Sequence, residues 1–271
     1  MTKESVRGSV RWIHEEKVDD TVTFRAGRLG TDMVADWPGF ARLRCARDGS
    51  AATLAPAAGV SPVEIAKLRN GQVRALLRDL SGDLALHGSA VALGGRAVVF
   101  IGQDGAGKST AAAEMCLTHG AQIFADDAVS LEVSARGIRV LPAERDHWLT
   151  RESCLALGIA IRAGEATDDK TALPASNVAR EPCSLALVVA LHFDPSVTRA
   201  VLRPLRGVDA ARMLLEAAIR FDVDDASARK RELEQITSIY HHAAFFDLVR
   251  PSRNPGCVAS LVIRALEGGE P

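Results

Sequence analysis

Residues 102–110 constrain the fold of this chain more than any other stretch. They read Gly-Gln-Asp-Gly-Ala-Gly-Lys-Ser-Thr and match the pattern G-x-x-x-x-G-K-[ST]. A strongly apolar run, 97–101, leads into the pattern, and a helix-favouring run, 110–117, follows it. A strand, a glycine-rich loop and a helix in this order predict an α/β domain whose loop binds phosphate.

The loop residues define the expected chemistry. Glycines let backbone N–H groups turn inward around phosphates, and the N-terminus of the following helix adds positive potential. Lys108 is expected to neutralise the β- and γ-phosphates, and Ser109 to bind Mg²⁺ through its hydroxyl. A chance glycine-rich turn is the alternative, which the full Gly-Lys-Ser-Thr and its flanks disfavour. The pattern predicts ATP and Mg²⁺, with the nucleotide held by Gly102, Asp104, Gly105, Ala106, Gly107, Lys108, Ser109 and Thr110.

Two adjacent carboxylates follow the next apolar segment. Residues 122–125 are expected to form a strand that delivers Asp126 and Asp127. At a strand end, one carboxylate can hold Mg²⁺, and the other can orient and deprotonate an attacking hydroxyl. A helix cap or a turn is the alternative role. It fits less well, because the chain continues as a strand over 129–133.

His87 lies on the strand expected before the one that feeds the loop. Residues 84–93 and 97–101 should form a hairpin that turns at Gly94 and Gly95. His87 can then point toward the same end of the sheet as Asp126, where it can polarise a carboxylate or contact phosphate. A lone histidine on a strand is more often structural, so spacing alone leaves both roles open.

Residues 142–183 show no regular pattern and are the expected substrate loop or lid. A loop that crosses the site needs a cation for phosphate, and Lys170 is the candidate. Glu152 is the corresponding candidate carboxylate for Mg²⁺. Charged clusters in loops are usually solvated, which is the alternative for both residues.

The remaining patterns predict two domains. Residues 1–60 should form a small β-rich lobe, with strands at 10–13, 22–24, 33–35, 40–45 and 52–54. A nucleotide-binding catalytic domain should span 61–271. It begins with a helix over 62–80, which Ser61 caps and Glu64 completes as a capping box. Further strands are expected at 138–141, 185–193, 197–202 (the partner of 185–193) and 245–249, and helices at 208–220, 226–240 and from Asn254 to 266.

Composition disfavours several classes of protein. A net charge of −1 over 271 residues argues against a globally basic nucleic-acid binder. The apolar stretch 84–101 contains His87, Arg96 and several glycines, so no membrane span is expected. The five cysteines are isolated, which predicts neither a disulfide framework nor a zinc site and favours the reducing cytoplasm. The oligomeric state stays open, a homo-oligomer included.

Three segments form an ordered set: 86–91 (Leu-His-Gly-Ser-Ala-Val), 102–110 and 125–129 (Ala-Asp-Asp-Ala-Val). The set resembles the catalytic domain of the HPr kinase/phosphorylase family. This resemblance implies a P-loop kinase fold of the HPr kinase and phosphoenolpyruvate carboxykinase type, with a mixed sheet. It also implies transfer of phosphate to a seryl hydroxyl. By the same resemblance, His87 and Lys108 belong to the active site, Asp126 is the general base, and Asp127 assists Ser109 in binding Mg²⁺.

The chain departs from the usual family pattern at several positions. Thr110 stands where the family has glutamate, and only Glu152 and residues 157–159 are similar to its glycine-rich signature. The layout looks like diverged HPr-kinase-like proteins that modify ribosomal precursor peptides, lasso-peptide kinases among them. The resemblance therefore implies a serine kinase with a peptide acceptor. Two alternatives stay open: a kinase of a free amino acid or sugar, and a nucleotide-dependent switch.

Overall fold

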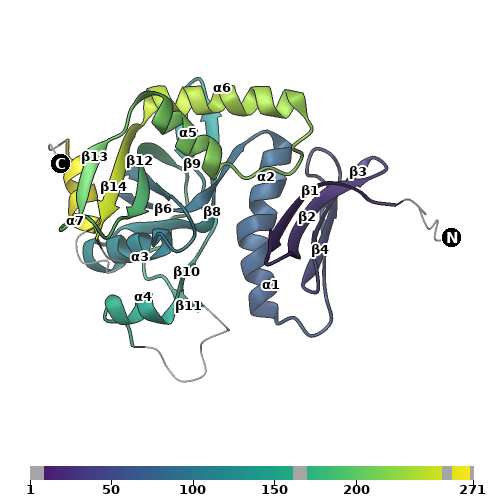
Figure 1. Ribbon diagram of the computed structural model, residues 1–271, viewed down its shortest axis with the longest axis horizontal. Coiled ribbons are helices and arrows are strands. Elements are labelled where there is room, and N and C mark those ends of the chain that lie inside the picture. Colours follow the sequence, from purple (N-terminus) through teal and green to yellow (C-terminus); the bar gives the residue numbers. More distant parts are fainter. Residues whose placement is uncertain (1–8, 161–169, 252–257, 269–271) are drawn as a thin grey trace. The chain divides into compact units, whose positions relative to one another are not determined.

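The computed structural model describes residues 9–160, 170–251 and 258–268 (Figure 1). The chain divides into two compact units. The first comprises Met1–Asp83 with Arg220–Glu232, and the second comprises Leu84–Ile219 with Leu233–Pro271. The boundary at residue 83 differs from the predicted one at residue 60, because the helices that follow Ser61 belong to the first unit.

The first unit contains a five-stranded antiparallel sheet in the order β1-β2-β3-β4-β5. Its strands are β1 (Arg11–Val18), β2 (Thr21–Leu29), β3 (Asp32–Trp37), β4 (Ala41–Cys45) and β5 (Thr53–Pro56). The predicted β-rich lobe is therefore confirmed. The indole nitrogen of Trp37 donates a hydrogen bond of 2.7 Å to Gln72 in the helical segment. Sheet and helices thus pack together, which explains where this unit ends.

The helical segment of the first unit begins and ends close to the predicted positions, with α1 (Pro62–Leu68) and α2 (Arg74–Ser81). The capping box is confirmed: the N–H of Glu64 donates to Ser61 Oγ, and the N–H of Ser61 donates to the Glu64 carboxylate. A π-helical turn, Arg69–Val73, lies between α1 and α2 and was not predicted. It contains Gly71, a residue type with little preference for a regular α-helix.

The second unit contains a seven-stranded sheet in the order β13-β14-β12-β7-β6-β8-β9. Strand β12 runs parallel to both β7 and β14, and the other neighbours are antiparallel. This confirms the α/β class with a mixed sheet. The strands are β6 (Leu84–Leu93), β7 (Arg96–Ile101), β8 (Gln122–Ser134), β9 (Gly137–Val140), β12 (Cys183–Phe193), β13 (Val201–Pro204) and β14 (Ala244–Arg250).

One predicted strand pairing in this sheet is wrong. Residues 197–202 were expected to pair with 185–193, but β13 pairs with β14. Both edges of β12 are already occupied along most of its length, by β7 on one side and β14 on the other. The next strand in the sequence, β13, therefore cannot pair with β12 along its length and joins the sheet at the free edge of β14.

Helices cover both faces of the second unit's sheet (Figure 1). On one face, α3 (Lys108–His119) and α7 (Val258–Leu266) bury residues such as Met115 and Val262 against the sheet. On the other face lie α5 (Gly207–Ala217) and α6 (Ala226–His242), which contribute Leu214 and Ile239. No helix in the described part of the chain combines the length and the apolar composition needed to cross a membrane.

Two further predictions about local structure are corrected. The aspartate pair does not end a strand, because β8, which is 13 residues long, continues through it to Ser134. The segment 142–183 is not irregular throughout: it contains the paired strands β10 (Asp146–Leu149) and β11 (Thr171–Pro174) and the short helix α4 (Arg151–Ala156). The predicted cap of the last helix at Asn254 lies outside the described residues.

Candidate active site

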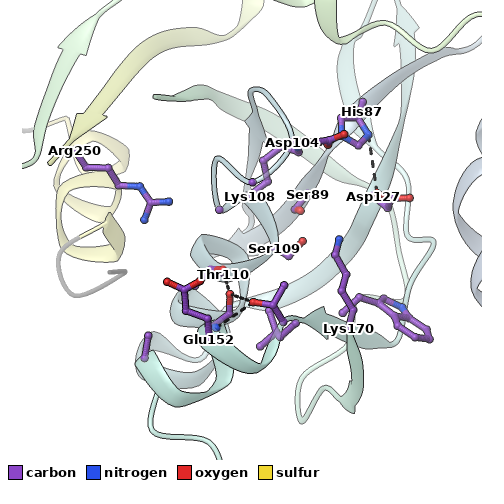
Figure 2. A pocket seen from close by; sticks show the side chains of 17 residues that line it. His87, Ser89, Asp104, Lys108, Ser109, Thr110, Asp127, Glu152, Lys170 and Arg250 are labelled. Carbon is purple, nitrogen blue, oxygen red and sulfur yellow. Dashed lines mark hydrogen bonds and ion pairs between the residues drawn. The ribbon is translucent and has the colours of Figure 1, made fainter. Parts of the chain in front are cut away.

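A pocket of about 460 Å³ lies where the loop after β7 meets β6, β8 and α4 (Figure 2). It belongs entirely to the second unit. Most of the residues singled out from the sequence line it: His87, Asp104, Gly105, Gly107, Lys108, Ser109, Thr110, Asp127, Glu152 and Lys170. Gly102, Ala106 and Asp126 do not line it. The pocket walls also include Ser89, Trp148, Leu149, Thr150, Ser153, Ala156 and Arg250, which the sequence did not single out.

The loop has the conformation that its glycines permit. Gly102 has φ +142°, and a side chain there would approach the carbonyl oxygen of Leu191 to 2.6 Å. Lys108 is only 8% exposed, and its ammonium donates to the carbonyl oxygens of Gly102 and Gln103 at 2.9 and 3.1 Å. Burial lowers the pKa of Lys108, whereas Asp104 and Asp127 act to raise it. The ammonium therefore lies on the inner side of the loop, beside the pocket.

Asp104 places a carboxylate inside the phosphate loop. Its side chain is 93% exposed and hydrogen-bonds Nε2 of His87 at 2.9 Å. Its Oδ1 also lies 3.7 Å from Nζ of Lys108. Desolvation acts to raise the pKa of Asp104, but the hydrogen bond from His87 and the charges of His87, Lys108 and Lys170 outweigh it and lower this pKa. The exposed carboxylate thus lies beside the basic groups of the pocket.

Asp126 lies behind the pocket wall. It is 3% exposed, and both of its oxygens accept hydrogen bonds: Oδ1 from the hydroxyl of Ser89 at 2.7 Å, and Oδ2 from the N–H of Trp148 at 2.9 Å. These bonds join β6, β8 and β10 at one point. In this arrangement Asp126 links these three strands by hydrogen bonds, and it does not line the space that a substrate would enter.

Asp127 does face the pocket, and its backbone explains how. In the register of β6 and β8, Asp127 lies opposite Gly88, and its neighbour Asp126 lies opposite Ser89. Strict alternation would turn Asp127 away from the face that carries His87 and Ser89. Its φ of +120° is unusual for a non-glycine residue and breaks the alternation. Its Oδ1 lies 4.0 Å from Nδ1 of His87, so His87 stands between Asp104 and Asp127.

Helix α4 is attached to the phosphate loop by hydroxyl groups. Thr110, 5% exposed at the start of α3, shares a hydrogen bond of 2.8 Å with the hydroxyl of Ser153. Thr150 caps α4 by accepting from the N–H of Ser153, and its own hydroxyl donates to Ser153 Oγ. Glu152 projects from the same helix into the pocket beside Thr110 (Figure 2). Thr110 thus helps to position the helix that carries Glu152.

The pocket suits a magnesium ion that arrives with phosphate. Within the described residues there is no group of three or more His, Cys, Asp or Glu side chains that could hold a metal ion. Mg²⁺ at phosphate sites typically keeps one or two protein ligands and takes the rest from phosphate and water. The Ser109 hydroxyl and the carboxylates of Asp127 and Glu152 line the same pocket and meet this limited requirement.

The sequence missed Ser89, Trp148, Ser153 and Arg250. Ser89 could have been found, because it lies two residues from His87 and so shares its face of the strand. Arg250 carried no signal: it comes from β14, and its guanidinium reaches the carbonyl of Ala106, 144 residues away in the chain. A spacing rule cannot reveal a contact of that kind.

No protein-family model matches the chain, and no curated protein sequence matches it. Among solved structures, the Hpr(Ser) kinase/phosphatase from Coxiella burnetii is similar over 68% of this chain and 97% of its own. The two share 13% sequence identity, with a TM-score of 0.35.

Proposed function

We propose that this protein is an ATP- and Mg²⁺-dependent kinase that phosphorylates a serine-type hydroxyl. One observation carries the proposal: the loop residues Lys108 and Ser109 and the carboxylate of Asp127 line a single pocket. A loop alone binds nucleotide, whereas a carboxylate beside it can also activate an acceptor. The order of the three sequence motifs further supports a kinase fold of the HPr kinase type.

The loop and its neighbours would bind the triphosphate. Backbone N–H groups at the start of α3 and the ammonium of Lys108 would face the phosphates, and Lys170, which also lines the pocket, would add a second positive charge. Bound Mg²⁺, held by Ser109 with Glu152, would neutralise charge on the phosphate oxygens and leave Asp127 available as a base. Preorganised donors of this type contribute roughly 3–4 kcal/mol each to transition-state stabilisation.

Asp127 is the residue we assign as general base in place of Asp126. The acceptor oxygen attacks the γ-phosphorus, and the bond from that phosphorus to the β,γ-bridging oxygen breaks. The hydroxyl proton passes to the Asp127 carboxylate, and ADP leaves with the bridging oxygen. His87 lies beside that carboxylate, with its Nδ1 4.0 Å from Oδ1 of Asp127. Both oxygens of Asp126 are already occupied by Ser89 and Trp148.

The acceptor we favour is a serine in a peptide, such as a ribosomally made precursor. This choice is supported by the resemblance to diverged HPr-kinase-like proteins. A free amino acid or sugar is the other acceptor to test. Dependence on ATP is consistent with a cytoplasmic location, which the isolated cysteines also favour.

Mass spectrometry tests the proposal directly. The protein is incubated with ATP, Mg²⁺ and serine-containing peptides, free serine or sugars in separate reactions, with Lys108→Ala as the control. We expect one acceptor to gain a phosphoryl group with wild-type protein and not with the variant. ATP turnover without any phosphorylated acceptor would overturn the kinase assignment and favour a nucleotide-dependent switch.

A further inference from the structure

Arg250 brings an additional charge to the phosphate loop from the far end of the chain. It is the last residue of β14, is 2% exposed and lines the pocket. Its backbone carbonyl accepts a hydrogen bond of 3.0 Å from the N–H of Asp194. Its Nη2 donates to the carbonyl oxygen of Ala106, inside the loop. Both its backbone and its side chain are therefore fixed.

The loop is shaped around this guanidinium. Gly107, with φ +86°, precedes α3, and a Cβ at that position would overlap Nη2 of Arg250. The glycine of the Gly-Lys-Ser pattern therefore does two things here: it permits the backbone conformation, and it makes room for Arg250. Loop and guanidinium form one wall of the pocket.

A buried carboxylate on α3 interacts with the same guanidinium. Glu114 is 8% exposed, and the charge of Arg250 acts on it. Burial raises the pKa of Glu114 to about 7, and a hydrogen bond from the Ala259 backbone and the charge of Arg250 act against that rise. An arginine stays charged in a protein interior, so its buried charge needs an anion nearby.

The position of Arg250 indicates which phosphates it can reach. Figure 2 shows Arg250 on the opposite side of Lys108 from His87 and Asp127. The acceptor hydroxyl and the γ-phosphate belong with Asp127, if the proposed function is right. The opposite side of the loop is then the side of the phosphates nearer the nucleoside.

We infer that Arg250 is a phosphate-binding residue that contacts the α- or β-phosphate of the nucleotide across Gly107. The inference rests on the proposed function, since it requires a nucleotide in this pocket. It makes a specific prediction, because the α- and β-phosphates are present in both ADP and ATP. Loss of Arg250 should therefore lower the affinity for ADP and for ATP by the same factor. Loss of a group that contacts only the γ-phosphate would lower the affinity for ATP alone.

Isothermal titration calorimetry tests this inference with Mg·ADP and with Mg²⁺ and a non-hydrolysable ATP analogue. The variants are Arg250→Gln and Arg250→Lys, with Arg203→Gln as the matched control, because Arg203 is an exposed arginine on β13. We expect Arg250→Gln to lower the affinity for both nucleotides about tenfold to a hundredfold, which is the effect of losing one charge-assisted hydrogen bond. Arg250→Lys should weaken both less, and the control should bind as wild type.

Unchanged ADP affinity in folded Arg250→Gln would overturn the inference. If circular dichroism shows that this variant does not fold, Arg250→Lys decides: wild-type affinity for ADP in that variant would overturn it equally. A loss confined to the ATP analogue would place Arg250 at the γ-phosphate and would also contradict the inference. If wild-type protein binds neither nucleotide, the proposed function itself fails, which is a distinct result.

Discussion

The carboxylate of Asp104 hydrogen-bonds the imidazole of His87 across the mouth of the phosphate loop, at 2.9 Å. The same carboxylate lies 3.7 Å from the ammonium of Lys108. A negative side chain thus interacts with cations that a triphosphate would need. A nucleotide must displace it or bind beside it.

Asp104→Asn is therefore expected to bind nucleotide more tightly than wild-type protein. Removing the negative charge of Asp104 relieves its repulsion of the phosphates. A gain of about 1.4 kcal/mol in binding free energy would appear as a tenfold higher affinity. Calorimetry with Mg·ADP measures the gain. Asp209→Asn, at an exposed position on α5, should change nothing. Weaker binding by Asp104→Asn would show that the carboxylate assists the nucleotide instead.

The two adjacent aspartates should respond differently to the same substitution. Asp127→Asn should lower kcat by about a hundredfold or more, the usual contribution of a general base, while the protein stays folded. Asp126→Asn should retain measurable transfer, because an amide can still accept from Trp148 and donate to Ser89. Steady-state kinetics beside thermal unfolding separate the two effects. An equal loss of kcat in both variants would return the role of base to Asp126.

Glu114 should make the free energy of unfolding depend on pH. Burial raises its pKa in the folded protein to about 7, above the ordinary value of 4.5. Between these two pH values the folded chain holds a proton that the unfolded chain has released. Stability therefore falls as pH rises through this interval, by up to about 3 kcal/mol for a shift of this size.

Urea unfolding at several pH values measures the dependence on Glu114. Glu114→Gln should flatten the decline between about pH 5 and about pH 7, since the amide has no proton to lose. Glu216→Gln, at an exposed site on α5, is the control and should keep the wild-type slope. A decline that persists unchanged in Glu114→Gln would assign it to another group.

The hydroxyl link between α3 and α4 should contribute to both stability and substrate binding. Ser153→Ala removes the partner of the buried Thr110 hydroxyl, which costs about 1–2 kcal/mol. It should also raise KM for ATP more than it lowers kcat, because α4 carries Glu152 into the pocket. Leu155→Ala changes an exposed residue of the same helix and should leave KM unchanged. A shift in stability without a change in KM would restrict the link to a structural role.

Short-range patterns predicted much of the fold. The hairpin of β6 and β7, the loop and the start of α3 are adjacent in the sequence, and their residues specify one another locally. The capping box at Ser61 is of the same kind. By contrast, β8 was predicted too short, because two aspartates in succession usually interrupt a strand. Here Ser89 and the Trp148 backbone satisfy Asp126, so the strand can continue.

The parts that sequence reasoning missed depend on contacts between distant residues. Strand β10 pairs with β11 across the segment that contains α4, and each of these strands has only four residues. Elements that short show no periodicity. Likewise, ten of the predicted residues line one pocket, whereas the position of Asp126 behind the pocket wall depends on its contact with β10.

The pairing of β6 with β8 has a consequence for how this site can vary. His87, Ser89, Asp126 and Asp127 all lie on these two strands within a few rungs of the ladder. A substitution changes one side chain, but inserting or deleting one residue in either strand turns every following side chain to the opposite face. Homologous pockets should therefore differ in residue type while the lengths of both strands around these positions stay fixed.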